Sequence, residues 1–155
     1  MQGFYWLIAG ELAGCSRPGG RGGGTLDADL DWLATQGIAA VVSLTEEPLT
    51  AGACAQHGLA ELHLAVVDLT PPEPEQIAAA LEFIDWQLAH DRPVVVHCLV
   101  GQGRTGTVLA AYRIRAGLTP AEALIELRGV CPGAVENRRQ EQALAEYARE
   151  RLWLV

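Results

Sequence analysis

The sequence contains no lysine. Its eleven Lys or Arg positions are all arginine. Schiff-base chemistry, which needs a lysine amine, is therefore excluded. Any anion site has to use guanidinium groups or backbone N–H groups. Positive charge is also scarce overall, since the formal net charge is -8, and this disfavours non-specific binding to nucleic acids or anionic membranes. We expect neither a nucleic-acid partner nor a membrane partner.

Long apolar runs are missing as well. No run approaches the roughly 18 residues of a membrane-spanning helix, and the N-terminus lacks the basic segment that precedes the apolar part of a secretory signal. We therefore expect a cytoplasmic protein. The four cysteines, Cys15, Cys54, Cys98 and Cys131, fit neither a zinc-binding spacing nor a dense disulfide framework. No metal and no cofactor are expected.

What is present suffices for one domain over residues 1–155, and we expect it to be a monomer. Half of the 155 residues are hydrophobic, enough for a substantial core. The hydrophobic patterns alternate between helical and strand periods, which predicts an α/β fold with a mostly parallel, twisted central sheet flanked by helices. We expect strands at residues 4–8, 38–44, 62–67 and 94–96, and helices at residues 26–36, 51–57, 73–89, 105–116, 120–131 and 136–153.

The most informative stretch covers residues 94–106. An apolar strand leads into His97 and Cys98, a loop with Gly101 and Gly103 follows, and Arg104 then opens a helix. The glycines let the backbone N–H groups turn inward, and the helix adds its own N–H groups and positive dipole end. Together they predict a phosphate-sized anion site. The residues expected to bind the phosphate are Leu99, Val100, Gly101, Gln102, Gly103 and Arg104.

In this setting we expect Cys98 to be a nucleophile. Helix N-termini and neighbouring cations stabilise thiolates, and a thiolate beneath a bound phosphate is placed for in-line attack. Arg104 would hold two phosphate oxygens, and Thr105 would donate a hydrogen bond to the sulfur. His97 is expected to anchor the loop backbone rather than to act as a base. The plain alternative is a tight glycine turn with a structural cysteine.

A leaving alcohol also needs a proton, and the best candidate donor is Asp68, in a proline-braced loop after a predicted strand. Since Glu46, Asp68 and Cys98 all follow strands, one site at the carboxyl ends of the sheet can gather them. Asp68 would then accept a proton from the water of the second step. Asp85 and Asp91 are weaker candidates. Two residues near the C-terminus are candidates for orienting the water, Gln140 and Glu136.

These residues resemble a known family. The string His97-Cys98-x-x-Gly101-x-Gly103-Arg104-Thr105-Gly106 is similar to the signature of the cysteine-dependent protein tyrosine phosphatases. Asp68 with its prolines, residues 132–136, residues 42–46 and the segment 6–14 resemble the small atypical dual-specificity phosphatases.

The resemblance implies a dual-specificity-phosphatase-like fold and a metal-independent reaction. In it, Cys98 is the nucleophile, Arg104 the phosphate clamp and Asp68 the general acid, and Thr105 assists the thiolate. Gln140 is similar in position to a glutamine of many relatives.

The expected substrates are phosphorylated proteins or peptides, with phosphotyrosine first and phosphoserine or phosphothreonine as further possibilities. A phosphoinositide or small-molecule phosphatase is disfavoured because Leu99, Val100 and Gln102 are neutral. A phosphate-binding adaptor without turnover and a sulfurtransferase are further alternatives. The glycine-rich loop at residues 18–24 departs from the family pattern, so substrate contacts there are not inferred.

Overall fold

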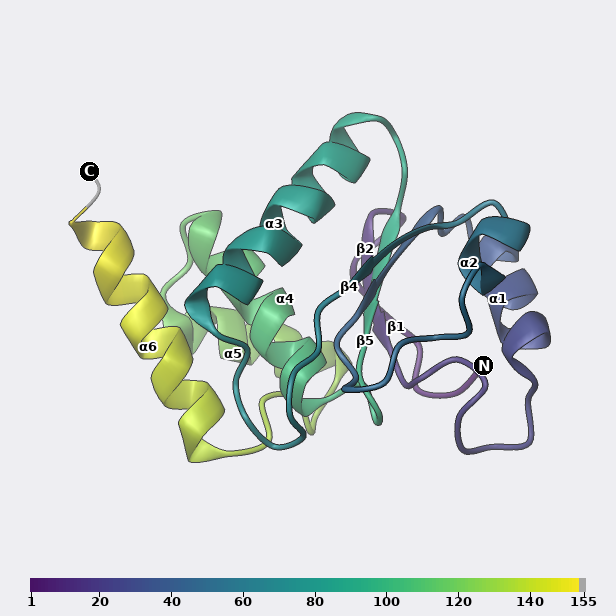
Figure 1. Cartoon of the computed structure of the whole chain (residues 1–155). Helices are drawn as coiled ribbons and strands as arrows, with labels where there is room; N and C mark the ends of the chain where they lie inside the picture. Colours follow the sequence, from purple (N-terminus) through teal and green to yellow (C-terminus); the bar gives the residue numbers. More distant parts are fainter. Residues whose placement is uncertain (154–155) are drawn as a thin grey trace.

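The computed structural model describes residues 1–153 and has a central five-stranded sheet with helices on both faces (Figure 1). The strand order is β1-β2-β5-β3-β4. The strands are β1 (Tyr5–Ile8), β2 (Leu12–Cys15), β3 (Ala40–Ser43), β4 (Ala60–His63) and β5 (Val94–His97). The helices are α1 (Leu26–Thr35), α2 (Ala53–Gln56), α3 (Pro74–Ala89), α4 (Gly103–Arg115), α5 (Pro120–Val130) and α6 (Arg138–Leu152).

Side chains of the central strand alternate between two hydrophobic cores. Val95 faces the smaller core with Leu30 and Leu33 of α1, while Val94 and Val96 face the larger core, which α3 to α6 cover. All three valines are completely buried. An apolar strand without polar alternation is typical of the middle of a parallel sheet, and the predicted α/β fold is confirmed.

Four parallel strands end at the same level of the sheet. His97 at the end of β5 pairs with Cys15 of β2 and with Ser43 of β3, and Ser43 pairs with His63 of β4. The segments that follow these strands therefore emerge side by side at one edge. Ligands of open α/β sheets bind beyond such carboxyl ends, so this edge is where a site is expected.

Two strands differ from the prediction. β2 was not expected, because Leu-Ala-Gly-Cys has little β-propensity; it forms because every residue in it is buried between β1 and β5. β1 pairs with β2 in antiparallel orientation, so the sheet is mixed at that edge. β4 begins and ends earlier than expected, although the N–H groups of Leu64 and Val66 beyond it still donate to the carbonyls of Ser43 and Leu44.

The helices agree with the prediction except at some of their ends. The capping box of α5 is confirmed, since Thr119 Oγ1 accepts from the Glu122 N–H and the Glu122 carboxylate accepts from the Thr119 N–H. α4 begins at Gly103, two residues early, which places Arg104 inside its first turn. α6 begins two residues late, with Asn137 as its N-cap. Within residues 1–153, no helix is long and apolar enough to span a bilayer.

Candidate active site

The loop after β5, residues 98–102 (the Cys98 loop), wraps around the sulfur atom of Cys98. The Gly101 N–H donates to Cys98 Sγ at 3.3 Å. Gly101 has a φ of 84°, and a Cβ there would collide with the carbonyl of Cys15 at the end of β2. Only glycine fits this tight approach in the left-handed region. Cys98 itself is buried, with 3% of its surface exposed.

His97 supports this loop from below. Its Nδ1 lies 3.1 Å from the carbonyl oxygen of Cys98, and its Nε2 lies 2.7 Å from Ser43 Oγ. A carbonyl only accepts, so Nδ1 carries the proton and Nε2 accepts from the Ser43 hydroxyl. Burial lowers the pKa of His97 to about 4, which leaves the ring neutral at pH 7. The ring therefore holds the Cys98 backbone.

The structure brings Asp68 to Arg104, as the strand ends suggest. Arg104 Nη2 is 2.9 Å from Asp68 Oδ1, and Arg104 Nη1 donates to the Val66 carbonyl at 2.9 Å. Arg104 is 3% exposed, whereas the Asp68 side chain is half exposed. Arg104 Nε has no partner among the described residues. Both side chains line a pocket of about 330 Å³, together with Arg17, Thr45, Glu46, Glu47 and Leu99.

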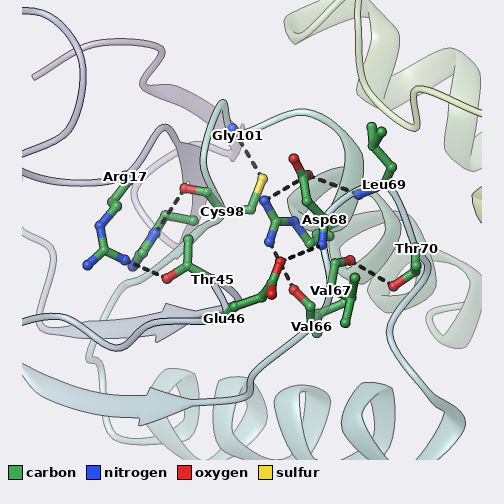
Figure 2. A network of polar contacts seen from close by, with 12 residues as sticks. Arg17, Thr45, Glu46, Val66, Val67, Asp68, Leu69, Thr70, Cys98 and Gly101 are labelled. Atoms are coloured by element: carbon green, nitrogen blue, oxygen red, sulfur yellow. Dashed lines mark hydrogen bonds and ion pairs between the residues drawn. The ribbon is translucent and has the colours of Figure 1, made fainter.

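The residues around Asp68, 66–70 (the Asp68 loop), form an irregular turn. Leu69 adopts a positive φ of 63°, and its N–H donates to Asp68 Oδ1 at 2.9 Å. The Thr70 hydroxyl donates to the Val67 carbonyl at 2.7 Å. Glu46, which follows β3, accepts from the Asp68 N–H at 3.1 Å (Figure 2). Asp68 is therefore held through its backbone as well as its carboxylate.

Gln140 and Glu136 both lie against the first residue of α4. A Cβ on Gly103 would touch the Glu136 carboxylate and Gln140 Nε2. Gln140 is completely buried; its Oε1 accepts from the Glu136 N–H at 2.9 Å, and its Nε2 has no partner among the described residues. The side-chain amide of Gln140 therefore keeps an N–H donor that can bind a ligand or water next to the start of α4.

One expected contact is not formed. Thr105 Oγ1 is buried and makes no hydrogen bond within residues 1–153, so it does not donate to the Cys98 sulfur. Thr105 lies in the first turn of α4, which begins at Gly103. The sulfur receives the Gly101 N–H instead.

The remaining candidates are placed as follows. Leu99 and Val100 are exposed at 40% and 55%, and the backbone carbonyl of Gln102 accepts from the Val135 N–H at 3.1 Å. Asp85 pairs with Arg115 on α4 at 2.6 Å. Asp91 lies in the turn before β5, at the opposite end of that strand. The structure therefore groups Asp68, rather than either alternative, with Cys98 and Arg104.

Two residues near the Cys98 loop escaped the sequence analysis. Arg17 lies two residues beyond β2, and its guanidinium donates to Thr45 Oγ1 at 2.6 Å and to the carbonyls of Glu47 and Pro48, each at 2.8 Å. The Tyr5 hydroxyl donates to the Gly101 carbonyl at 2.8 Å. Recognising β2 would have identified Arg17, because it would then follow a parallel strand. No local signal marks Tyr5.

Comparisons with known proteins agree with this geometry. Residues 13–118 match the family described as "Polymorphic toxin system, DSP-PTPase phosphatase". The crystal structure of Tk-PTP in the active form superposes with a TM-score of 0.84 at 31% identity, covering 94% of this chain and 96% of that chain.

Among curated relatives, an uncharacterized protein of Methanocaldococcus jannaschii is 39% identical over 59% of this chain and 61% of its own length. The tyrosine-protein phosphatase cdcA of Emericella nidulans is 33% identical over 72% of this chain and 19% of its own length. The phosphatidylglycerophosphate phosphatase PTPMT1 of Arabidopsis thaliana is 28% identical over 77% and 37%. The chain thus spans less than two thirds of each of these relatives. By its family match and its site, the chain belongs to the DSP-PTPase phosphatases of the cysteine-dependent protein tyrosine phosphatase superfamily.

Proposed function

We propose that this phosphatase hydrolyses phosphorylated tyrosine, and secondarily phosphoserine or phosphothreonine, in proteins through a phosphocysteine on Cys98. The observation that carries the proposal is the 2.9 Å ion pair between Arg104 and Asp68 at the pocket that also reaches the Cys98 loop. In the proposed reaction, Arg104 is the anion clamp, Asp68 the proton-transfer group and Cys98 the nucleophile. A structural cysteine in a plain glycine turn would need neither group.

In the first step the Cys98 thiolate attacks phosphorus. Arg104 and the N–H groups of the Cys98 loop hold the non-bridging oxygens, whose charge they stabilise in the transition state. The bound phosphate takes the place of Asp68 on the Arg104 guanidinium, and Asp68 in its protonated form gives its proton to the substrate oxygen as the bond from phosphorus to that oxygen breaks. The products of this step are the free hydroxyl compound and phosphocysteine.

In the second step water attacks the phosphocysteine. Asp68, now a carboxylate, takes the proton from the water, and the sulfur leaves as a thiolate with release of inorganic phosphate. The buried amide of Gln140 lies beside the start of α4, where an unpaired N–H donor is suited to orient that water. Glu136 holds Gln140 through its backbone N–H.

The pocket chemistry supports a protein substrate over a polyanionic lipid headgroup. Glu46, Glu47 and Asp68 line the same pocket as Arg17 and Arg104, so carboxylates offset the guanidinium charge around the bound phosphate. Additional phosphates of an inositide would meet these carboxylates and the neutral side chains of the Cys98 loop. A phosphate on an otherwise uncharged tyrosine ring meets no such repulsion.

A lipid phosphomonoester is the second candidate, because PTPMT1 of Arabidopsis thaliana carries the name of a phosphatidylglycerophosphate phosphatase. The test is a panel of phosphotyrosine and phosphoserine peptides, phosphoinositides and phosphatidylglycerophosphate in mixed micelles, all with a chelator present. We expect the highest kcat/KM on phosphotyrosine peptides and no turnover by the Cys98→Ser variant. A higher value on the lipids would favour the second candidate, and a requirement for added metal would contradict the mechanism.

A further inference from the structure

Asn137 joins the Asp68 loop to the C-terminal helix. Its Nδ2 donates to the Leu69 carbonyl at 2.9 Å, and its Oδ1 accepts from the Gln140 N–H at 3.0 Å. One side chain therefore caps α6 and at the same time holds the carbonyl of Leu69, the residue that follows Asp68. The two ends of this contact lie 68 residues apart in the sequence.

The Asp68 loop needs such support from outside. Leu69 is a non-glycine residue in the left-handed region, an unfavourable conformation that persists only where the surroundings offset its cost. Its side chain is 57% exposed, so burial does not hold it in place. The hydrogen bond from Asn137 meets this strained residue directly.

We propose that Asn137 is a positioning residue for Asp68, and that it keeps the carboxylate beside Arg104, in the position from which it transfers a proton to the leaving group. The inference rests on the proposed role of Asp68 as the general acid. Without the Nδ2 donor, the peptide between Leu69 and Thr70 is free to rotate. Leu69 can then leave its positive φ, and this moves the preceding peptide, whose N–H donates to the Asp68 carboxylate. Proton transfer is sensitive to such movement, because a displacement of about 1 Å costs up to 10²-fold in rate.

A residue that only capped α6 would make the same contact with Gln140. The test therefore has to separate capping of α6 from positioning of Asp68. Asn137→Asp does so. Aspartate is as good an N-cap as asparagine and suits the helix dipole, so α6 keeps its cap. The variant lacks the N–H donor, however, and sets a carboxylate against the Leu69 carbonyl.

The experiment measures kcat/KM on aryl phosphates whose leaving groups decrease in acidity, from 4-nitrophenyl phosphate to phenyl phosphate. This parameter reports formation of the phosphocysteine. For Asn137→Asp we expect little change on 4-nitrophenyl phosphate, which needs little protonation, and a loss of about 10- to 10²-fold on phenyl phosphate. Added to Asp68→Asn, the same substitution should cause no further loss.

Thr25→Ala is the matched control. It removes the cap of α1, where Thr25 accepts from the Ala28 N–H, and it lies outside the site pocket. We expect it to lower the melting temperature without changing the leaving-group dependence. The positioning role is refuted if Asp68→Asn steepens the leaving-group dependence and Asn137→Asp leaves it unchanged. It is refuted equally if Asn137→Asp lowers kcat/KM by the same factor on all substrates. If Asp68→Asn itself leaves the dependence flat, the proposed acid is wrong and the inference falls with it.

Discussion

The Cys98 loop and the Asp68 loop meet at Arg104 but are organised in different ways. The Cys98 loop runs without interruption from a buried strand into a helix, and its sulfur is held by an N–H group three residues away. The Asp68 loop belongs to no regular element. It is held by Glu46, Arg104 and Asn137, which come from three distant parts of the chain.

This contrast separates two kinds of chemistry. In the proposed mechanism, phosphate binding depends on two buried residues, Cys98 and Arg104, each 3% exposed. In the same mechanism, proton transfer depends on Asp68, a half-exposed carboxylate in a turn whose Val67 and Leu69 side chains are exposed. Segments of the second kind open at low free energy. We therefore infer that perturbations of this enzyme affect proton transfer before phosphate binding.

The largest effect should come from removing the proton donor alone. Asp68→Asn keeps the shape of the side chain but carries no transferable proton, so we expect kcat/KM on phenyl phosphate to fall by ~10²–10⁴. Inhibition by inorganic phosphate should be nearly unchanged, because the Cys98 loop is intact. The measurement is steady-state kinetics on phenyl and 4-nitrophenyl phosphate, together with inhibition by inorganic phosphate. The control variant is Asp85→Asn, which changes a carboxylate outside the site. Equal losses on phenyl and 4-nitrophenyl phosphate would contradict the division between the loops.

The residue shared by both loops should come next. Arg104→Lys retains a positive charge but loses the planar pair of donors that binds two oxygens. We expect kcat to fall by about 10²–10³ on every aryl phosphate, whatever its leaving group. Inhibition by inorganic phosphate should weaken in parallel, and Arg113→Lys, outside the pocket on the same helix, should change neither. A loss confined to phenyl phosphate would mean that Arg104 acts mainly on Asp68.

The same contrast explains what could be predicted from the sequence. The Cys98 loop is local, so its valine-rich strand, glycines and helix start predicted its position and the α/β fold around it. Asp68 was identified because it follows a strand at the carboxyl edge. The strand ends predicted that Glu46 and Asp68 would share one edge, but not the individual contacts of the Asp68 loop, which join residues 22, 36 and 68 positions apart.

The errors have physical causes as well. β2 was missed because burial between two strands outweighs the poor β-propensity of Leu-Ala-Gly-Cys, and Arg17 was missed with it. The expected Thr105 contact is not formed, since its buried hydroxyl makes no hydrogen bond within residues 1–153. Roles of individual side chains in the site stay predictions.

Acidification should loosen the support beneath the Cys98 loop. Because burial lowers the pKa of His97 to about 4, the unfolded chain takes up this proton at higher pH than the folded protein does. Stability from the neutral ring is complete above the ordinary pKa of 6.5 and declines as pH falls toward 4, by on the order of 3 kcal/mol.

Denaturant unfolding at several pH values measures this decline, and His97→Asn should flatten it. His57 provides the control of opposite sign. Its ring contacts the carboxylates of Asp27 and Asp31, which raise its pKa, so its contribution grows as pH falls and is lost as pH rises. His57→Asn should therefore steepen the loss of stability on acidification. The assignment to His97 is wrong if the two variants change the pH dependence in the same direction.

The smallest effect should come from Tyr5, a residue of the edge strand β1 whose side chain contacts the Cys98 loop. Tyr5→Phe removes the hydroxyl that donates to the Gly101 carbonyl at 2.8 Å, while the ring stays packed against Gly14. Leaving that carbonyl without its donor costs about 1–3 kcal/mol of unfolding free energy. Phosphate inhibition should weaken, because the Gly101 N–H is then less firmly directed at the sulfur.

Leaving-group dependence separates this variant from changes in the Asp68 loop. Tyr5→Phe does not touch Asp68, so kcat/KM on phenyl and 4-nitrophenyl phosphate should fall by the same factor. Tyr147→Phe, which removes a hydroxyl from α6 outside the site pocket, is the matched control for stability and for phosphate inhibition. If Tyr5→Phe instead affects phenyl phosphate selectively, the two loops are coupled through the Cys98 backbone, and the separation of phosphate binding from proton transfer is incorrect.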